Sequence, residues 1–362
     1  ALAQKLLDGA TSKRDKIDRV FQYVSKDIRY QQEYETTIAG VKPHACPVVL
    51  ERGYGDCKDK AVLLIMLLRK AGVAADFALL RTTDAGVVEK DVPNQQFNHA
   101  IVHVRKQDGI DQGFFTDATT DALDLGNLRH DDQGATSLVL DPDTGAWHFE
   151  QIPYQTADLE YSNATVTLDV AAAKGHIDVA SRGAQASSQR RAVRDAETAK
   201  KLEQGWAAIL WPGVTMTSGT ADTSEDLGKR FTLGVDVDAS AIMHDDDDGK
   251  RIDVPHYTPF ADLTKLTARK LPLKLGIPSS QTVSLSFAIP AGKKIVRAPG
   301  DFHVADACFT ADRKTTTTGT DVKIVQSYTT TCPTVLPTDY AAFRAKALEV
   351  VTRENDPLVL SK

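Results

Sequence analysis

Two apolar patterns in the N-terminal part of the chain are typical of helices. Residues 17–28 place apolar side chains at helical spacing after Ser12, which predicts an amphipathic helix. Residues 61–68 are an unbroken apolar run, too long and too apolar for a surface helix. This run predicts a buried helix whose first turn contains Cys57 and which ends near Gly72.

Alternating apolar and polar positions predict strands along the rest of the chain. In the first part, residues 97–104 and 114–115 have the β-branched and aromatic content of strands, and residues 141–158 suggest a turn and a connection. Helices are expected at about 187–210 and 339–353. Further strands are expected at 164–170, 175–179, 231–237, 282–289, 302–309 and 322–328. We therefore expect an α+β chain with a core in residues 1–158 and a mostly antiparallel β module in residues 159–362.

Composition narrows the class of protein. No run of 18 apolar residues occurs in the 362-residue sequence, so no transmembrane segment is expected. Residues 1–158 hold 18 Lys and Arg against 24 Asp and Glu, and this difference equals the net charge of −6 for the whole chain. An acidic first module disfavours nucleic acid as a partner. The chain starts at Ala1 without a charged and then apolar leader, so any signal peptide or preceding domain would lie outside it.

Three segments together indicate a cysteine-nucleophile site. Cys57 precedes the buried helix, where the positive end of the helix dipole favours a thiolate, and Gly55 leaves room for a tight loop beside it. His99 stands at the entry to the strand at 97–104, and Asp117 follows the short strand at 114–115. Two adjacent strands could set the imidazole beside the carboxylate, while the helix delivers the thiol to the other ring nitrogen. His103 shares the strand face of His99 and is its nearest competitor.

The sequence contains no pattern that favours a metal site. The four cysteines form no C-x-x-C pair, which makes a zinc site improbable. The acidic run at 245–248 lacks the alternating ligand spacing of a calcium loop, and a solvated loop is the simpler interpretation. No metal and no cofactor are therefore expected.

The segments around Cys57, His99 and Asp117 resemble the transglutaminase-like superfamily, and residues 42–61 are similar to its bacterial branch. This resemblance implies a papain-like core flanked by β-rich domains, with Cys57 as nucleophile, His99 as base and Asp117 as the orienting carboxylate. The superfamily also has an aromatic residue near the oxyanion, for which Tyr30 is the best positional match. Tyr34 and Tyr54 are the alternatives.

The expected function is acyl transfer on amide substrates through a thioester at Cys57. Hydrolysis of a peptide or protein substrate is the first expectation, and transamidation or deamidation of glutamine is the second. The alternative from another class is a catalytically silent peptide-binding or scaffolding module. The presence of all three triad residue types argues against that alternative.

Cys308 and Cys332 are candidates for a disulfide. If the strands at 302–309 and 322–328 form a hairpin whose turn lies in the Thr-rich run at 315–320 and is centred on Thr320, the two cysteines face each other across it. Such a bridge would place the protein in an oxidising compartment, the periplasm or the outside of the cell.

Overall fold

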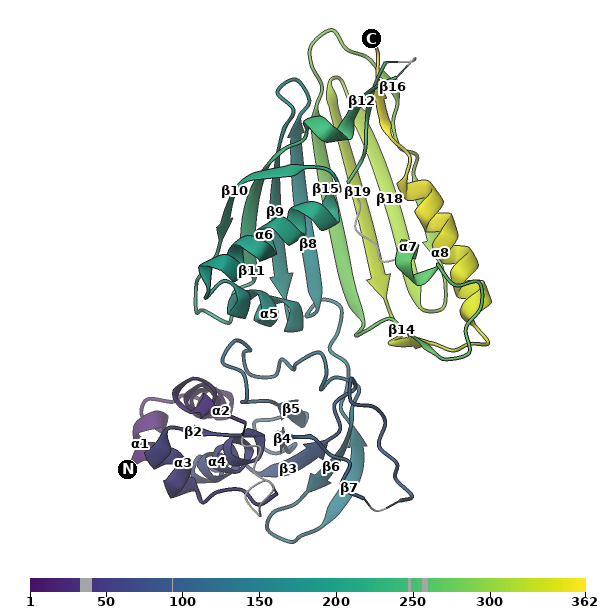
Figure 1. Ribbon diagram of the computed structural model, residues 1–362. Helices are drawn as coiled ribbons and strands as arrows, with labels where there is room; N and C mark the ends of the chain where they lie inside the picture. The colour runs from purple at the N-terminus through teal and green to yellow at the C-terminus, as the bar shows by residue number, and fades with distance from the viewer. Residues whose placement is uncertain (33–40, 93, 247–248, 256–259) are drawn as a thin grey trace. The chain divides into compact units, whose positions relative to one another are not determined.

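The computed structural model describes residues 1–32, 41–92, 94–246, 249–255 and 260–362. The chain divides into two compact units, residues 1–155 and residues 156–362 (Figure 1). Each unit has its own hydrophobic core, and each is described separately below.

The N-terminal unit combines helices with a five-stranded sheet. Its helices are α1 (Leu2–Leu7), α2 (Lys13–Gln22), the single π-turn η1 (Tyr23–Asp27), α3 (Cys46–Arg52) and α4 (Cys57–Lys70). Strands β1 (Arg29–Tyr30) and β2 (Tyr54–Gly55) form a short parallel pair. The remaining strands are β3 (Ala75–Leu80), β4 (His99–Val104), β5 (Phe114–Thr116), β6 (Thr136–Leu140) and β7 (Trp147–Gln151).

Helix α4 lies at the centre of this unit. It packs against strands β3 and β4 of the antiparallel sheet, whose order is β5-β4-β3-β6-β7. Its apolar residues 61, 63–65, 67 and 68 are buried with the inner face of α2. The apolar run is unbroken because α4 is covered by helices on one side and by the sheet on the other. The helix predicted from that run is confirmed.

The C-terminal unit is rich in strands. Its helical elements are α5 (Ala184–Ala192), α6 (Ala196–Leu210), η3 (Ser240–Ile242), α7 (Phe260–Leu263) and α8 (Tyr340–Glu354). Its longer strands are β8 (Tyr161–Asp169), β9 (Lys174–Arg182), β10 (Thr215–Ala221), β11 (Phe231–Asp238), β15 (Ser279–Ala288), β18 (Phe309–Thr318) and β19 (Asp321–Thr330). The shorter ones are β12 (Met243–Asp246), β13 (Gly249–Ile252), β14 (Leu273–Lys274), β16 (Ile295–Arg297), β17 (Phe302–Ala305), β20 (Thr334–Val335) and β21 (Leu358–Leu360).

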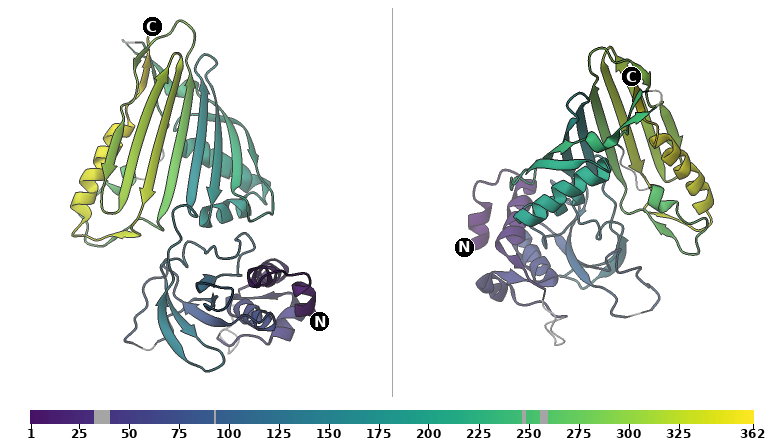
Figure 2. Two further views of the ribbon diagram at one scale, coloured as in Figure 1. Left: turned by 180° about the vertical axis from the view of Figure 1, so that it is seen from behind. Right: turned by 45° about the horizontal axis from the view of Figure 1, so that its top comes forward.

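An eight-stranded sheet organises the C-terminal unit, in the order β10-β11-β9-β8-β15-β19-β18-β17. All neighbours are antiparallel except β15 and β8, which are parallel. Helices α5 and α6 lie on one face near β9–β11, and α8 covers the other end of that face (Figure 1). The opposite face of the sheet, turned toward the viewer in the left view of Figure 2, is covered by no helix of the described residues. One layer of helices on one sheet explains why the strands alternate between buried and exposed residues.

A predicted helix and a predicted connection differ from the structure. The charged helix expected at 187–210 is two helices, because the side chain of Asp195 caps a new helix by accepting a hydrogen bond from the Thr198 N–H at 2.8 Å. The connection expected at 141–158 contains strand β7, which pairs with β6 as the sheet's edge strand. Its residues are mostly exposed, so the apolar pattern of a strand is weak there.

The hairpin near the C-terminus has a different register from the predicted one. The segment 302–309 is not one strand: β17 ends at Ala305 and β18 begins at Phe309. Residues 315–318 of the Thr-rich run belong to β18, and the chain reverses at the last two residues of the run, between Thr318 and Asp321. Threonine is β-branched and favours an extended strand, while Gly319 supplies the positive φ of 60° that the turn requires.

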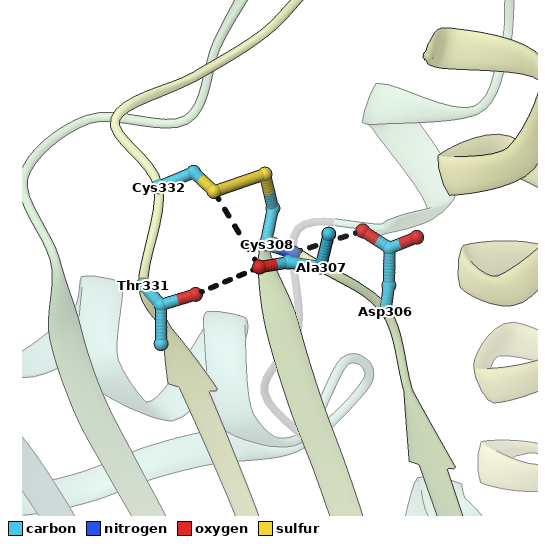
Figure 3. Close-up of a disulfide and its surroundings, with 5 residues drawn as sticks. All are labelled: Asp306, Ala307, Cys308, Thr331 and Cys332. Atoms are coloured by element: carbon cyan, nitrogen blue, oxygen red, sulfur yellow. Dashed lines mark hydrogen bonds between the residues drawn. A yellow bond between two sulfur atoms is a disulfide. The ribbon is translucent and has the colours of Figure 1, made fainter.

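A disulfide joins Cys308, which directly precedes β18, to Cys332, which lies two residues after the end of β19 (Figure 3). Their Cα atoms are 4.7 Å apart. The Thr331 N–H donates a hydrogen bond of 2.9 Å to the Cys308 carbonyl, which extends the ladder by one step. The bridge therefore closes the open end of the hairpin, although the predicted pairing within the ladder was wrong by one residue.

The α+β expectation is confirmed at the level of helices combined with mainly antiparallel sheets. Among the residues that the structure describes, no helix has both the length and the apolar character needed to cross a membrane.

Candidate active site

Cys57 is the first residue of α4, and its position is fixed by reciprocal capping. The Asp59 N–H donates to the Asp56 side chain at 3.2 Å, and the Asp56 N–H donates to the Asp59 side chain at 3.4 Å. Both carboxylates are buried. The His44 N–H also donates to Asp59, at 2.7 Å. The turn that presents the half-buried Cys57 is thus held from both sides.

The segment before Cys57 passes close to α4. In the β1–β2 pair, Tyr30 lies opposite Gly55, and the Gln31 N–H donates to the Gly55 carbonyl at 3.0 Å. A Cβ atom at Gly55 would lie 2.7 Å from Cβ of Asp59. Only glycine allows this approach, so the sequence motif places Tyr30 near the start of the helix.

His99 is the first residue of β4, where Asn98 ties the strand to its neighbour. The Asn98 amide donates to the Thr82 hydroxyl at 2.8 Å and accepts from the Thr82 N–H at 2.9 Å. His99 itself pairs with Leu80 of β3 and is 5% exposed. The strand entry is therefore rigid, and the imidazole is almost completely removed from solvent.

Asp117 reaches His99 because of the register between β4 and β5. Thr116 pairs with Val102, so the next residue, Asp117, lies on the same face as Ile101 and His99. Oδ2 of Asp117 is 3.1 Å from Nε2 of His99, and the carboxylate is fully buried. The antiparallel pairing thus produces the His–Asp contact expected from the sequence.

The neighbouring Thr119 orients the Asp117 carboxylate. Its N–H donates to Oδ1 at 2.8 Å, and its hydroxyl donates to Oδ2 at 2.9 Å. Since a carboxylate that accepts several hydrogen bonds is held in one rotamer, the oxygen that faces His99 is fixed.

The Cys57 thiol lies close enough to the His99 ring to help raise the pKa of the imidazole. Because Nε2 faces Asp117, the other ring nitrogen is the one left for the thiol. Burial opposes the charged imidazole, but the Asp117 carboxylate overrides it and raises the pKa of His99 well above 6.5. Burial likewise opposes the Asp117 carboxylate, but the His99 charge lowers its pKa below 3.8. Such a pair favours an imidazolium beside a carboxylate.

The tyrosines considered as oxyanion donors have different surroundings. Burial and the neighbouring Cys57 and Asp117 raise the pKa of Tyr30, so its hydroxyl stays a neutral donor near the thiol. The ring of Tyr54 instead lies 4.8 Å from the Arg52 guanidinium and 5.6 Å from that of Arg29. Tyr34 lies outside the described residues.

The competing histidine belongs to a different cluster. Nδ1 of His103 is 3.4 Å from Asp76, and its ring centroid is 4.8 Å from that of Phe115. Arg105 donates to the same Asp76 carboxylate. His103 therefore has a structural environment of its own.

Sequence reasoning missed a second carboxylate at His99. Asp132 is fully buried, its Oδ1 is 3.8 Å from Nε2 of His99, and neither of its oxygens accepts a hydrogen bond. Ligand-type atoms of His99, Asp117 and Asp132 lie within 4.8 Å of one another in the described part of the chain. Because Asp117 is already hydrogen-bonded to His99 and Thr119, we interpret this group as one histidine beside two carboxyl groups and not as a metal centre.

Lys60 is a second residue that the sequence did not single out. Its buried ammonium donates to the backbone carbonyls of Ser25 at 3.2 Å and Ile28 at 2.6 Å. Burial lowers its pKa to about 8, against the opposing influence of Asp117. One turn after Cys57, Lys60 thus fixes the chain that leads into Tyr30.

Two family models match the chain. Residues 1–110 match the transglutaminase-like superfamily. Residues 254–360 match a "Domain of Unknown Function with solved-structure structure" (DUF3858). The first match contains Cys57 and His99, while Asp117 lies just beyond its end. The second lies wholly within the C-terminal unit.

One solved structure resembles the whole chain in fold. It is a crystal structure of a "putative protease" from Parabacteroides distasonis, with a TM-score of 0.57 and 13% sequence identity. The alignment covers 100% of this chain and 54% of the other, so this chain spans about half the length of that protein. No curated protein matches the sequence. At this identity the likeness concerns the fold.

Proposed function

Since residues 1–110 of this chain carry a transglutaminase-like core, we propose that the protein is a cysteine-dependent acyltransferase with a papain-like active site that hydrolyses amide bonds in peptides. One observation carries this proposal: the buried His99 imidazole has the Asp117 carboxylate 3.1 Å from one nitrogen, in a site where the Cys57 thiol is near enough to influence the pKa of the ring. This is the geometry in which a base takes a proton from a nucleophile while a carboxylate holds the base.

Before the first step, the thiol proton of Cys57 has passed to His99, whose imidazolium form the Asp117 carboxylate stabilises. The Cys57 thiolate then attacks the carbonyl carbon of the substrate amide. The carbonyl electrons move to oxygen and form a tetrahedral oxyanion. The N–H groups of the first turn of α4 lack intrahelical acceptors, so the Cys57 N–H is available as one donor to this oxyanion. The Tyr30 hydroxyl is the second donor.

Collapse of this intermediate breaks the carbon–nitrogen bond. His99 gives its proton to the departing amine, and the acyl group remains on Cys57 as a thioester. His99 then removes a proton from water, whose oxygen attacks the thioester and releases a carboxylic acid and the free thiol. Asp117 stabilises the imidazolium in both halves of the cycle.

The acyl acceptor distinguishes the two enzymatic alternatives. If a primary amine replaces water in the second half, the product is a new amide, as in glutamine transamidation. If the substrate is a glutamine side chain and water is the acceptor, the product is glutamate plus ammonia. The fold likeness to a protein described as a "putative protease" favours peptide hydrolysis as the first choice.

A product analysis tests the proposal. A peptide library and a glutamine-containing peptide are each incubated with and without a primary amine, and mass spectrometry follows free acid, ammonia and amine adduct. We expect peptide-bond cleavage as the main reaction and none with Cys57→Ser. Amine adduct as the main product would establish transamidation instead.

The binding-module alternative makes an opposite prediction. A silent module would give no product from any peptide, and its Cys57 would resist peptidyl electrophiles. The His99–Asp117 pair near Cys57 argues against this alternative, because a thiol that only supports structure has no need for a buried imidazole oriented by a carboxylate.

We also propose an oxidising compartment, the periplasm or the outside of the cell. The disulfide between Cys308 and Cys332 is the observation that supports it. Reducing compartments keep such thiols free. Non-reducing peptide mapping of protein isolated from its native compartment tests this point, since two free thiols there would contradict it.

A further inference from the structure

Asp132 forms a second carboxylate contact with His99 that the proposed mechanism does not use. Its Oδ1 is 3.8 Å from the same Nε2 atom that lies 3.1 Å from Asp117. Both carboxylates are completely buried. One imidazole nitrogen therefore faces two carboxyl groups in a region without solvent.

The two carboxyl groups have unequal support. Asp117 accepts hydrogen bonds from the N–H and hydroxyl of Thr119 in addition to its contact with His99. Asp132 accepts none, at either oxygen. Because like charges this close in a buried site do not both ionise without compensation, the unsupported group is the one that keeps a proton. Burial first, and then the Asp117 charge, indeed raise the pKa of Asp132 well above 3.8.

The other charged groups near this cluster do not supply the hydrogen bonds that Asp132 lacks. Arg129 is a further cation that acts on Asp132, but its Nε and Nη2 are both bonded to Asp131. Lys60 directs its ammonium at backbone carbonyls. The remaining groups that act on the cluster are the Cys57 thiol, the Tyr30 hydroxyl and the Asp131 carboxylate.

We infer that Asp132 is a positioning residue that holds a proton beside the His99–Asp117 pair at neutral pH and sets the upper pH limit at which His99 stays protonated. As a neutral acid it leaves Asp117 as the single anion that orients the imidazole. When the pH rises and Asp132 ionises, its new charge stabilises the imidazolium. The inference rests on the proposed role of His99 as base.

The test needs no substrate, so its failure is distinct from failure of the proposed activity. Histidine labelled with nitrogen-15 is followed by NMR from about pH 5 to about pH 10, with His99→Gln used to assign the signal. Asp132→Asn should lower the midpoint of His99 deprotonation by about one pH unit. The control Asp121→Asn removes a carboxylate of the same loop that acts on Lys60, and should leave the midpoint unchanged.

Infrared spectroscopy provides the second readout. Wild-type protein labelled with carbon-13 aspartate should show the carbonyl stretch of a protonated carboxyl at neutral pH, and Asp132→Asn should lose it. An unchanged His99 midpoint in Asp132→Asn, or absence of the wild-type band, would overturn the inference. Should the asparagine variant not fold, Asp132→Ser supplies the same comparison with a smaller polar side chain.

Discussion

Tyr30 lies directly opposite Gly55 in a parallel pair of two-residue strands, and Gly55 precedes Cys57 by two residues. The pairing is possible because Gly55 has no side chain to strike Asp59. This short backbone contact therefore brings Tyr30 near Cys57. As a result, the electrostatic influence of Cys57 helps to raise the pKa of Tyr30.

Replacing Tyr30 by phenylalanine should lower kcat by about 10²-fold, because one donor to the oxyanion is lost. The ring and the β1–β2 pairing remain, so the melting temperature should change little. Tyr54→Phe is the matched control, since its ring packs between two guanidinium groups. Steady-state kinetics on a peptide substrate measures both variants, and equal losses would remove the oxyanion role from Tyr30.

Asp117→Asn should preserve the fold and lower kcat by about 10³- to 10⁴-fold, because the amide favours the wrong tautomer of His99. His99 should also lose its proton at lower pH, since the carboxylate that raises its pKa is gone. Asp121→Asn serves as the control. If Asp121→Asn inactivated the enzyme and Asp117→Asn did not, the orienting carboxylate would be misassigned.

Iodoacetamide should alkylate Cys57 at least about tenfold faster than Cys46 between about pH 6 and about pH 7. Burial raises the pKa of the Cys46 thiol, so its thiolate is scarce below the usual value of about 8.5 and increases only as the pH rises beyond it. His99→Ala should slow the reaction at Cys57 and leave Cys46 unaffected. Mass spectrometry of tryptic peptides measures both rates, and similar rates for the two thiols would contradict the assignment of Cys57.

The double variant Cys308→Ser with Cys332→Ser should lose about 3 kcal/mol of stability, as expected for a cross-link with a sequence separation of 24 residues. Denaturant unfolding measures this loss. A reductant should destabilise the wild type and have no effect on the double variant. A wild type that is equally stable with and without reductant would show that the bridge contributes nothing.

The local settings of Cys57 and His99 could be predicted because both depend on neighbours in sequence. The apolar run after Cys57 and the β-branched residues after His99 define a helix and a strand that the structure contains. Asp132 has no such signal. It lies in the loop between β5 and β6, and its approach to His99 depends on the path of that loop in space.

The errors in the second unit have a common cause, which is competition between local preferences. The charged segment after residue 187 favours helix throughout, but Asp195 favours a cap over the helix interior. In the Thr-rich run, polarity suggests a turn while β-branching favours a strand, and pairing with β19 decides for the strand. The pattern of residue types alone does not show whether the preference for a cap or a helix, or for a turn or a strand, is the stronger one.

The ammonium of Lys60 joins helix α4 to the segment that precedes β1, two parts of the chain that are separate in sequence. It belongs to the helix that begins with Cys57, yet it grips the carbonyls of Ser25 and Ile28, just ahead of Tyr30. Thermal displacement of α4 must therefore carry the tyrosine strand with it. We therefore expect the spacing between the Cys57 thiol and the Tyr30 hydroxyl to vary less than it would if α4 and β1 were joined only through loops.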